Sequence, residues 1–384
     1  MTSLRFLHTS DLQLGMTRWF LEGTDGEAQA RFDDARLRAI DRLGELATEH
    51  SCAFIVVAGD VFEHNSLSER VTGRALERLR CLPVPVYLLP GNHDPLVADS
   101  IFYRTRGEGI HVITDTTPIE VSEGVELVGA PLTARHATTD VVRRALEPLS
   151  PTGHIRIAVG HGQAESRSND TTPDQIDLAY VEDRLADGTI DYLALGDTHS
   201  TLPVGSSRRV WFSGAPETTD FHDLTEGVEG GESDSGNALV VTVEKSSVTD
   251  ASVEVEKVAV GQWTFEALTR EVSSVGDVDE FLATLRAYPT KATTVIKYAL
   301  RGTLDMTATR RLEEGLDELR PVFAALYERT RLMDLHLEPG ADELAALDIS
   351  GFAASALAEL ITGAETDPAA RDAVNLMFRL TREA

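Results

Sequence analysis

The stretch Leu89-Pro90-Gly91-Asn92-His93-Asp94-Pro95 closes an apolar segment that begins at residue 84. The segment has the composition of a buried strand, and Pro90 and Gly91 end it in a sharp turn. An amide, an imidazole and a carboxylate follow directly after this turn. A solvated turn would explain the stretch if it stood alone, but the same construction occurs at other places in the chain.

Four other predicted strands end in polar side chains that can bind a metal ion. The apolar runs and the residues that follow them are 4–8 with Asp11, 53–58 with Asp60, 155–159 with His161, and 192–195 with Asp197 and His199. Taken singly, each residue has a structural explanation, such as a turn histidine or a carboxylate that caps a helix. Because open α/β sheets bind ligands in the crevice at the carboxyl ends of their strands, we expect these side chains to meet at one site.

The length of 384 residues predicts two or three domains. No apolar run reaches the roughly 20 residues of a membrane span, and the N-terminus lacks the features of a signal peptide, so a cytoplasmic location is expected. Cys52 and Cys81 are the two cysteines of the sequence, and they predict neither a disulfide framework nor a CxxC zinc site. A metal site would therefore use His, Asp and Asn.

The charge balance is strongly acidic, with a net charge of -28 at pH 7 and an isoelectric point of about 4.7. This disfavours a protein that holds DNA through a broad basic surface, because phosphate contacts need Lys and Arg. Contacts to nucleic acid are expected to be local or made by a partner. The arginines considered for local phosphate contacts, with ordinary surface charge as the alternative for each, are Arg135, Arg143, Arg144, Arg167, Arg208 and Arg209.

Strands and helices alternate over the first two-thirds of the chain, which favours an α/β fold. The acidic segment 226–236, rich in Gly and Ser, is predicted to be a mobile loop. It does not end the domain, because 238–243 and 252–258 still alternate like paired strands. The predicted domains are 1–260, a small α+β domain at 261–340, and a helical segment at 341–384.

In the small domain a long helix is predicted at 308–329, kinked or split at Pro321. The C-terminal segment is predicted to form two short helices. Their apolar residues either pack on the body of the protein or form an exposed docking face.

Five short motifs resemble, in order, those of the calcineurin-like metallophosphoesterases. They are His8-Thr9-Ser10-Asp11, Gly59-Asp60, Gly91-Asn92-His93-Asp94, Gly160-His161-Gly162 and Gly196-Asp197-Thr198-His199. Within that superfamily the chain is similar to the SbcD-type DNA repair nucleases, the partners of SbcC-type coiled-coil ATPases. This similarity is carried by FLHTSDLQLG at 6–15, GDVFEHNSLS at 59–68 and FSGAPETTDF at 212–221.

The resemblance implies a four-layer α-β-β-α sandwich, followed by a capping domain and an ATPase-docking tail, and a homodimer. It also implies two divalent metal ions bridged by Asp60, with His93, helped by Asp94, as the proton donor to the leaving oxygen. The remaining implied ligands are Asp11, Gln13 and His199 for the first ion, and Asn92, His161 and Asp197 for the second.

Two positions depart from the family pattern. The first motif usually reads Asp-x-His but has Gln13 here, and the fifth usually reads Gly-His-x-His but has Asp197. An amide oxygen is a weaker ligand than imidazole, and a carboxylate is a hard anionic one, so oxygen donors replace nitrogen donors. We predict a preference for Mn²⁺ or Mg²⁺ over Zn²⁺, with weaker binding of the first ion.

Three functions are compatible with these residues. The leading expectation is a metal-dependent DNA phosphodiesterase, an exonuclease and endonuclease of DNA repair and recombination that acts with an SbcC-type ATPase. A phosphatase or phosphodiesterase for a small substrate would use the same kind of site. The third is a scaffold subunit of an ATPase complex, weakened in catalysis by the changes at Gln13 and Asp197.

Overall fold

The computed structural model describes residues 2–23, 26–105, 107–164, 172–225, 231–337, 351–364, 367, 369–370, 372–374 and 376–377. The chain forms two compact units. The first comprises Met1–His222 and Glu229–Phe265, and the second comprises Asp223–Val228 and Glu266–Ala384.

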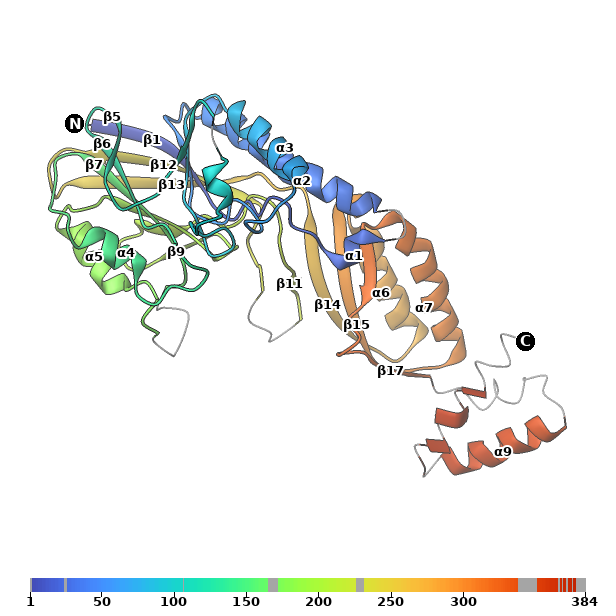
Figure 1. Ribbon diagram of the computed structural model, residues 1–384. Helices are drawn as coiled ribbons and strands as arrows, with labels where there is room; N and C mark the ends of the chain where they lie inside the picture. The colour runs from blue at the N-terminus through green and yellow to red at the C-terminus, as the bar shows by residue number, and fades with distance from the viewer. Residues whose placement is uncertain are drawn as a thin grey trace. The chain divides into compact units, whose positions relative to one another are not determined.

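Two six-stranded sheets make up the first unit (Figure 1). In the first sheet the order is β13-β12-β1-β2-β3-β4, and the run from β1 to β4 is parallel. The strands are β1 (Thr2–Thr9), β2 (Ile55–Val57), β3 (Val86–Leu88), β4 (Ile110–Val112), β12 (Asn237–Lys245) and β13 (Ala251–Ala259).

The second sheet has the order β5-β6-β7-β8-β10-β9, with a parallel centre from β6 to β10. Its strands are β5 (Ile119–Ser122), β6 (Val125–Gly129), β7 (Ile155–His161), β8 (Tyr192–Gly196), β9 (Leu202–Val204) and β10 (Val210–Phe212).

Helices cover the outer face of each sheet. On the first sheet these are α2 (Glu27–Glu49) and α3 (Glu69–Arg80), preceded by the short α1 (Trp19–Glu22). On the second they are α4 (Val141–Leu146) and α5 (Leu178–Ala186). Side chains at the N-caps begin three of these helices: the oxygens of Ser68, Asp140 and Asp177 accept backbone N–H groups of the first turn.

Three apolar cores separate the four layers of helices and sheets in the first unit. One lies between α2, α3 and the first sheet, one between the two sheets, and one between the second sheet and α4 and α5. Along β12 the side chains alternate between them: Val240 joins the core under the helices, while Leu239 and Val241 join the core between the sheets. The predicted four-layer α-β-β-α sandwich is thus confirmed.

The second unit contains a sheet of order β11-β14-β15-β16, with β17 also paired to β15. The helices α6 and α7 pack on this sheet around a core that includes Phe281, Tyr298 and Leu316. The elements are β11 (His222–Asp223), β14 (Thr264–Val272), α6 (Val275–Ala287), β15 (Thr294–Leu304), α7 (Met306–Leu319), β16 (Ala325–Glu328) and β17 (Asp334–Leu337).

The predicted helix at 308–329 is too long. Helix α7 ends at Leu319, a 3-10 turn follows with Pro321 in its first turn, and residues 325–328 form β16. Proline cannot donate a backbone hydrogen bond and its ring clashes with the preceding turn, so the helix stops before it. Of the C-terminal segment, 338–350 lie outside the described residues, and α9 (Phe352–Ala364) forms the helix expected there.

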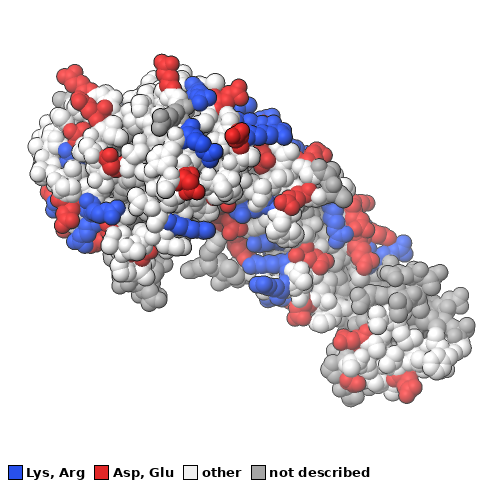
Figure 2. All heavy atoms as spheres, viewed as in Figure 1, with Lys and Arg blue, Asp and Glu red and all other residues white. Residues whose placement is uncertain are grey.

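The face of the molecule drawn in Figure 2 carries acidic and basic side chains interspersed, without a large area of one sign. No helix among the described residues has the length and apolar character that a bilayer crossing requires.

Candidate metal centre

The turn that follows β3 is folded onto the turn that follows β2. The carboxylate of Asp94 accepts two backbone N–H groups, from Gly91 and from Phe62, each at 2.8 Å. The N–H of His93 donates to Oδ1 of Asp60 at 3.0 Å. A Cβ on Gly91 would lie 2.1 Å from the same Oδ1, so this close approach requires glycine.

The turns that carry the acidic residues have unusual backbone conformations. Asp11, Gln13, Asp60 and Asp197 all have positive φ angles, of 52°, 41°, 52° and 99°. Non-glycine residues adopt this region at a cost of about 1 kcal/mol or more, and they cluster at functional sites. Backbone bonds hold two of these turns together: Asp11 N–H donates to Gly59 O at 3.0 Å, and Gln13 N–H donates to Asp60 O at 2.9 Å.

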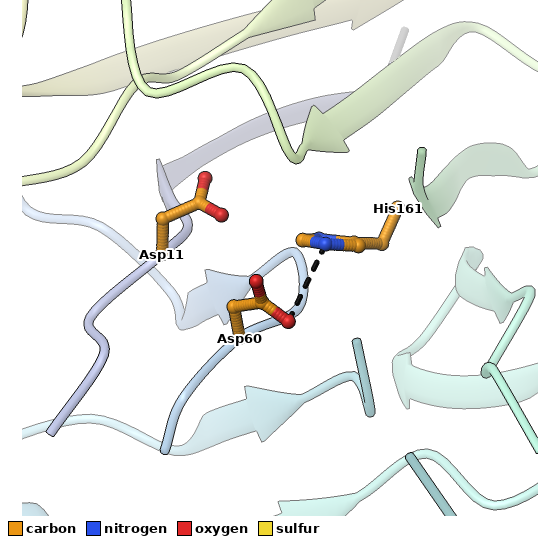
Figure 3. Close-up of side chains that lie close together, drawn as sticks. All are labelled: Asp11, Asp60 and His161. Carbon is orange, nitrogen blue, oxygen red and sulfur yellow. Dashed lines mark ion pairs between the residues drawn. The ribbon is translucent and has the colours of Figure 1, made fainter. Parts of the chain in front are cut away.

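Asp11, Asp60 and His161 form a buried cluster at the carboxyl ends of β1, β2 and β7. One ligand atom from each lies within 4.8 Å of the other two, and the three residues are 0%, 2% and 1% exposed. Figure 3 shows the two carboxylates and the imidazole directed toward one another, with Nε2 of His161 3.4 Å from Oδ1 of Asp60.

The other nitrogen of His161 fixes the orientation of its ring. Nδ1 lies 2.8 Å from the carbonyl oxygen of Ala58, which can only accept, so Nδ1 carries a proton and donates it. Nε2 is thus the nitrogen that can offer its lone pair to a cation that displaces the proton of the cluster. Metal-binding histidines usually have such a partner on the second ring nitrogen.

Asn92 completes this cluster from the turn after β3. Its Oδ1 lies 2.9 Å from Nε2 of His161, and the two oxygens of Asp60 lie 3.0 and 3.1 Å from the same position. The two oxygens of Asp60, and Nε2 of His161 in its unprotonated form, are therefore acceptors around one amide position. An NH₂ group turned to this side satisfies them without a metal, and a cation between them would instead bind the amide oxygen.

A second group of donors lies beside Asp11. Nε2 of His199 is 3.2 Å from Nε2 of Gln13 and 3.8 Å from Oδ1 of Asp11. The other amide atom of Gln13, Oε1, is buried and has no hydrogen-bond partner in the described part of the chain. A buried carbonyl oxygen without a donor is costly, so this atom fits a position where a cation binds.

Asp197 lies between the two groups of donors. Its N–H donates to both oxygens of Asp11 at 3.3 Å, and its own Oδ1 is 3.8 Å from Nε2 of His161. All seven residues predicted as ligands therefore come together at one edge of the sandwich.

The pKa shifts of Asp11 and His161 show that negative charge is concentrated in the cluster. Burial raises the pKa of Asp11, and the charge of Asp60 raises it further, against the lowering effect of the two histidines. For His161, burial lowers the pKa, but the carboxylates of Asp60, Asp11 and Asp197 outweigh it and raise the pKa well above its usual value. In the metal-free protein the cluster therefore keeps protons that cations would displace.

The residues present fit divalent cations. Carboxylate and amide oxygens, together with two imidazoles, are the donor types that such ions use, and among the described residues Oε1 of Gln13 is buried without a hydrogen-bond donor of its own.

His93 and Asp94, the two residues predicted for proton transfer, have different surroundings. His93 is partly exposed, and its Nδ1 lies 3.1 Å from the carbonyl oxygen of Glu63, which accepts a hydrogen bond from Nδ1. The buried Asp94 binds backbone amides instead of His93, and burial raises its pKa to about 8. The contacts of Asp94 hold the turn that carries His93, and its help to His93 in proton transfer stays a prediction.

The candidate arginines lie in different places. Arg135 is exposed on a loop that two backbone bonds tie to the turn after β3: Leu132 N–H donates to Pro90 O at 3.1 Å, and Leu96 N–H donates to Leu132 O at 2.8 Å.

Arg208 does not lie with the metal ligands, contrary to its selection as a substrate contact. It precedes β10, which runs parallel to β8 in the register Val210↔Leu193. Arg208 is therefore level with Asp191, six residues before Asp197, at the opposite edge of the sheet. Arg209, beside it, donates to the carbonyl oxygen of Ala251. The sequence shows that Arg208 precedes this strand, but not that the strand runs parallel to β8, which puts Arg208 at the end opposite the ligands.

Arg143 is engaged elsewhere, in an ion pair with Asp177 and over the ring of Tyr180. Arg144 is exposed on α4. Arg167 lies outside the described residues.

One residue of the site was missed from the sequence. Glu232 is 6% exposed and lies 3.4 Å from Nδ1 of His199, in a segment predicted to be a mobile loop. Residues 231–236 are instead held by backbone bonds, such as Thr201 N–H to Asp234 O and Gly236 N–H to Ala215 O. The acidic, glycine-rich composition gave no signal for this, because the partners are distant in sequence.

Comparison with known proteins agrees with this geometry. Residues 4–201 match the family model described as calcineurin-like phosphoesterase, so the chain belongs to this family of phosphoester hydrolases. It is similar to the uncharacterized metallophosphoesterase YhaO of Bacillus subtilis (strain 168), with 24% identity over 208 residues. That match covers 52% of this chain and 49% of the relative, so the chain spans about half the length of the protein it matches.

Proposed function

We propose that this protein is a Mn²⁺- or Mg²⁺-dependent DNA phosphodiesterase that acts in the cytoplasm with an SbcC-type coiled-coil ATPase. The observation that carries the hydrolytic part is the buried cluster of Asp11, Asp60 and His161, with Asn92 directed into it. Cations bound there would compensate the negative charge that the cluster buries.

The proposed role of each site residue follows from its surroundings. Divalent ions held by the seven ligand residues would bind the phosphate oxygens and supply a nucleophilic hydroxide from water. His93 stands at the rim of the cluster, on the turn that also carries Asn92. The carbonyl oxygen of Glu63 holds the N–H at Nδ1, so Nε2 is the nitrogen left for the substrate, and the imidazolium form of the ring would give its Nε2 proton to the leaving oxygen.

The donor set supports the choice of metal. Gln13 and Asp197 stand where imidazoles are usual in the family, so five of the seven ligand residues offer oxygen. Hard ions such as Mn²⁺ and Mg²⁺ prefer oxygen ligands, whereas Zn²⁺ accepts nitrogen and sulfur more readily.

The proposal of DNA as substrate, and of an ATPase partner, rests on the similarity of three motifs to the SbcD-type nucleases. The charge distribution is compatible with it. The net charge is -28, and the face in Figure 2 has no large basic area, so a partner would supply most of the grip on DNA. Arg135, on the loop tied to the turn after β3, is the local candidate for a phosphate contact.

The test is digestion of end-labelled single- and double-stranded DNA by the purified chain with Mn²⁺, compared with hydrolysis of a small aryl phosphodiester. We expect DNA to be cleaved and the reaction to stop with EDTA. Efficient cleavage of the small diester without cleavage of DNA would contradict the proposed substrate, whereas cleavage of neither would contradict the activity.

His93→Ala and Asn92→Ala separate the two parts of the site. His93→Ala is expected to slow cleavage by about 10²–10⁴-fold and to leave Mn²⁺ affinity unchanged. Asn92→Ala should weaken Mn²⁺ binding as well. Equal nuclease rates for His93→Ala and wild type would assign the activity to a contaminant. Co-purification with the ATPase and the mass in solution test the partner and the proposed homodimer.

A further inference from the structure

Glu232 has the contacts of a residue that positions a metal ligand. It is buried, and its carboxylate accepts the backbone N–H groups of Thr219 and Asp220, each at 2.8 Å. The hydroxyl of Thr219 donates to the same carboxylate. In addition to these contacts, Oε2 of Glu232 lies 3.4 Å from Nδ1 of the His199 ring.

Thr219 links the two side chains. Its Oγ1 lies 2.5 Å from Nδ1 of His199 while it also bonds Glu232. The ring of His199 is thus held on its Nδ1 side by a hydroxyl and a carboxylate, and its Nε2 is directed toward Gln13 and Asp11.

The surrounding chain fixes both parts of this arrangement. Arg18 donates to the carbonyl oxygen of Thr219, and the buried Arg36 donates to that of Thr218. Glu232 is fixed by its own N–H, which donates to Phe221 O at 3.2 Å. These hydrogen bonds therefore fix Thr219 and Glu232 beside His199.

We propose that Glu232, acting through Thr219 and directly, positions His199 and strengthens it as a ligand of the first metal ion. A carboxylate on the far nitrogen fixes the tautomer that leaves Nε2 unprotonated and makes the imidazole a better donor. The same ion has lost a usual imidazole at Gln13, so the strength of His199 matters more here. This inference rests on the metal site of the proposed function and assigns Glu232 a part in it.

Glu217 provides a matched control. It is also a buried glutamate, 1% exposed, whose carboxylate accepts backbone N–H groups, from Thr218, Gln262 and Trp263. It belongs to the same segment as Thr219 but does not contact His199. A change to glutamine at either position removes one charge and disturbs a comparable set of backbone bonds.

The experiment is Mn²⁺ titration by calorimetry on wild type, Glu232→Gln and Glu217→Gln. We expect two Mn²⁺ ions in wild type, a loss of about 10–100-fold in affinity for one of them in Glu232→Gln, and no such loss in Glu217→Gln. Thr219→Val, which removes the linking hydroxyl, is expected to lower the same affinity and serves if Glu232→Gln does not fold.

Thermal unfolding with and without Mn²⁺ separates positioning from general stability. In EDTA both glutamine variants should lose stability, while the rise in Tm on adding Mn²⁺ should shrink only for Glu232→Gln. Two unchanged affinities in Glu232→Gln, or equal losses in both variants, would overturn the inference and leave the proposed function standing. If wild type bound no Mn²⁺, the proposed function would fail and this inference with it.

Discussion

The two ends of the β-sandwich handle buried negative charge in opposite ways. At the end opposite the metal centre, the buried Asp191 of the second sheet pairs with the buried Lys245 of β12 at 2.9 Å, and it also accepts the N–H of Arg156. At the metal centre, Asp11 and Asp60 are equally buried, but among the described residues neither forms an ion pair with Lys or Arg.

This difference shows what each end is built for. Burying a carboxylate costs several kcal/mol unless a charge or hydrogen bonds compensate it. At the end opposite the metal centre the chain supplies its own cation, Lys245, and its ion pair with Asp191 connects the two sheets. At the metal centre the described partners of the two carboxylates are titratable histidines and hydrogen-bond donors such as the N–H groups of His93 and Asp197, and the remaining charge would be compensated by ions from solution.

The largest effect is expected at Asp60. Asp60→Asn should lower phosphodiesterase activity on the order of 10³-fold, because it removes a charged carboxylate of the buried cluster, the one that the family resemblance assigns to both metal ions. It should also abolish the Mn²⁺-dependent rise in Tm. Asp191→Asn is the control at the other end: it should lower Tm equally with and without Mn²⁺. A full Mn²⁺ response in Asp60→Asn would break the comparison.

At the other end, Lys245→Met is expected to destabilise the fold by about 3–5 kcal/mol, because it leaves Asp191 charged and unpaired in the interior. Denaturant unfolding in EDTA and in Mn²⁺ measures this, and the loss should be the same in both. Adding Asp191→Leu to this variant should recover most of the stability, because a buried pair replaced by apolar groups is often neutral. If stability did not recover, the unpaired charge of Asp191 would not be the cause of the destabilisation in Lys245→Met.

The metal-free centre should be sensitive to pH. Burial lowers the pKa of His199, but Glu232 and Asp11 outweigh this and raise it to about 9. A raised pKa gives stability that is complete below about pH 6.5 and is lost as the pH rises through about 9. The loss is on the order of 3 kcal/mol.

Denaturant unfolding in EDTA at pH 6 and pH 9.5 checks this, with His199→Gln as the control that lacks the group. Wild type should lose more stability than the control over this range. With excess Mg²⁺ the difference should vanish, since the cation replaces the proton. A larger loss in His199→Gln would contradict the assigned direction.

The smallest effect on activity is expected at Arg135, which belongs to neither of the two buried charge clusters. Arg135→Ala should raise the KM for DNA by roughly fivefold, since an exposed charge contact is worth about 1 kcal/mol or less. It should also reduce the salt dependence of binding by about one counterion. Arg208→Ala, at the opposite edge of the sheet, is the matched control and should change neither quantity. Equal effects of the two variants would remove Arg135 from the substrate path.

Local patterns in the sequence were sufficient for most elements of the fold. Alternation and apolar runs predicted the strands that carry Asp11, Asp60, Asn92, His161 and Asp197, since strand periodicity depends on neighbouring residues. The break at Pro321 was also predictable, because proline acts within one turn. Residues 325–328 were assigned to a helix but form β16, because pairing with β15 is a contact between distant segments.

The sequence by itself determined which chemical groups follow the strands, and thereby the family and the kind of metal centre. Only the tertiary structure decided which of the other charged residues share that centre. It brought Glu232 to His199, paired Asp191 with Lys245 and placed Arg208 at the end of the sheet opposite the ligand residues. The physical reason is that turns and strands follow from local chemistry, whereas compensation of buried charge depends on contacts between residues far apart in the chain.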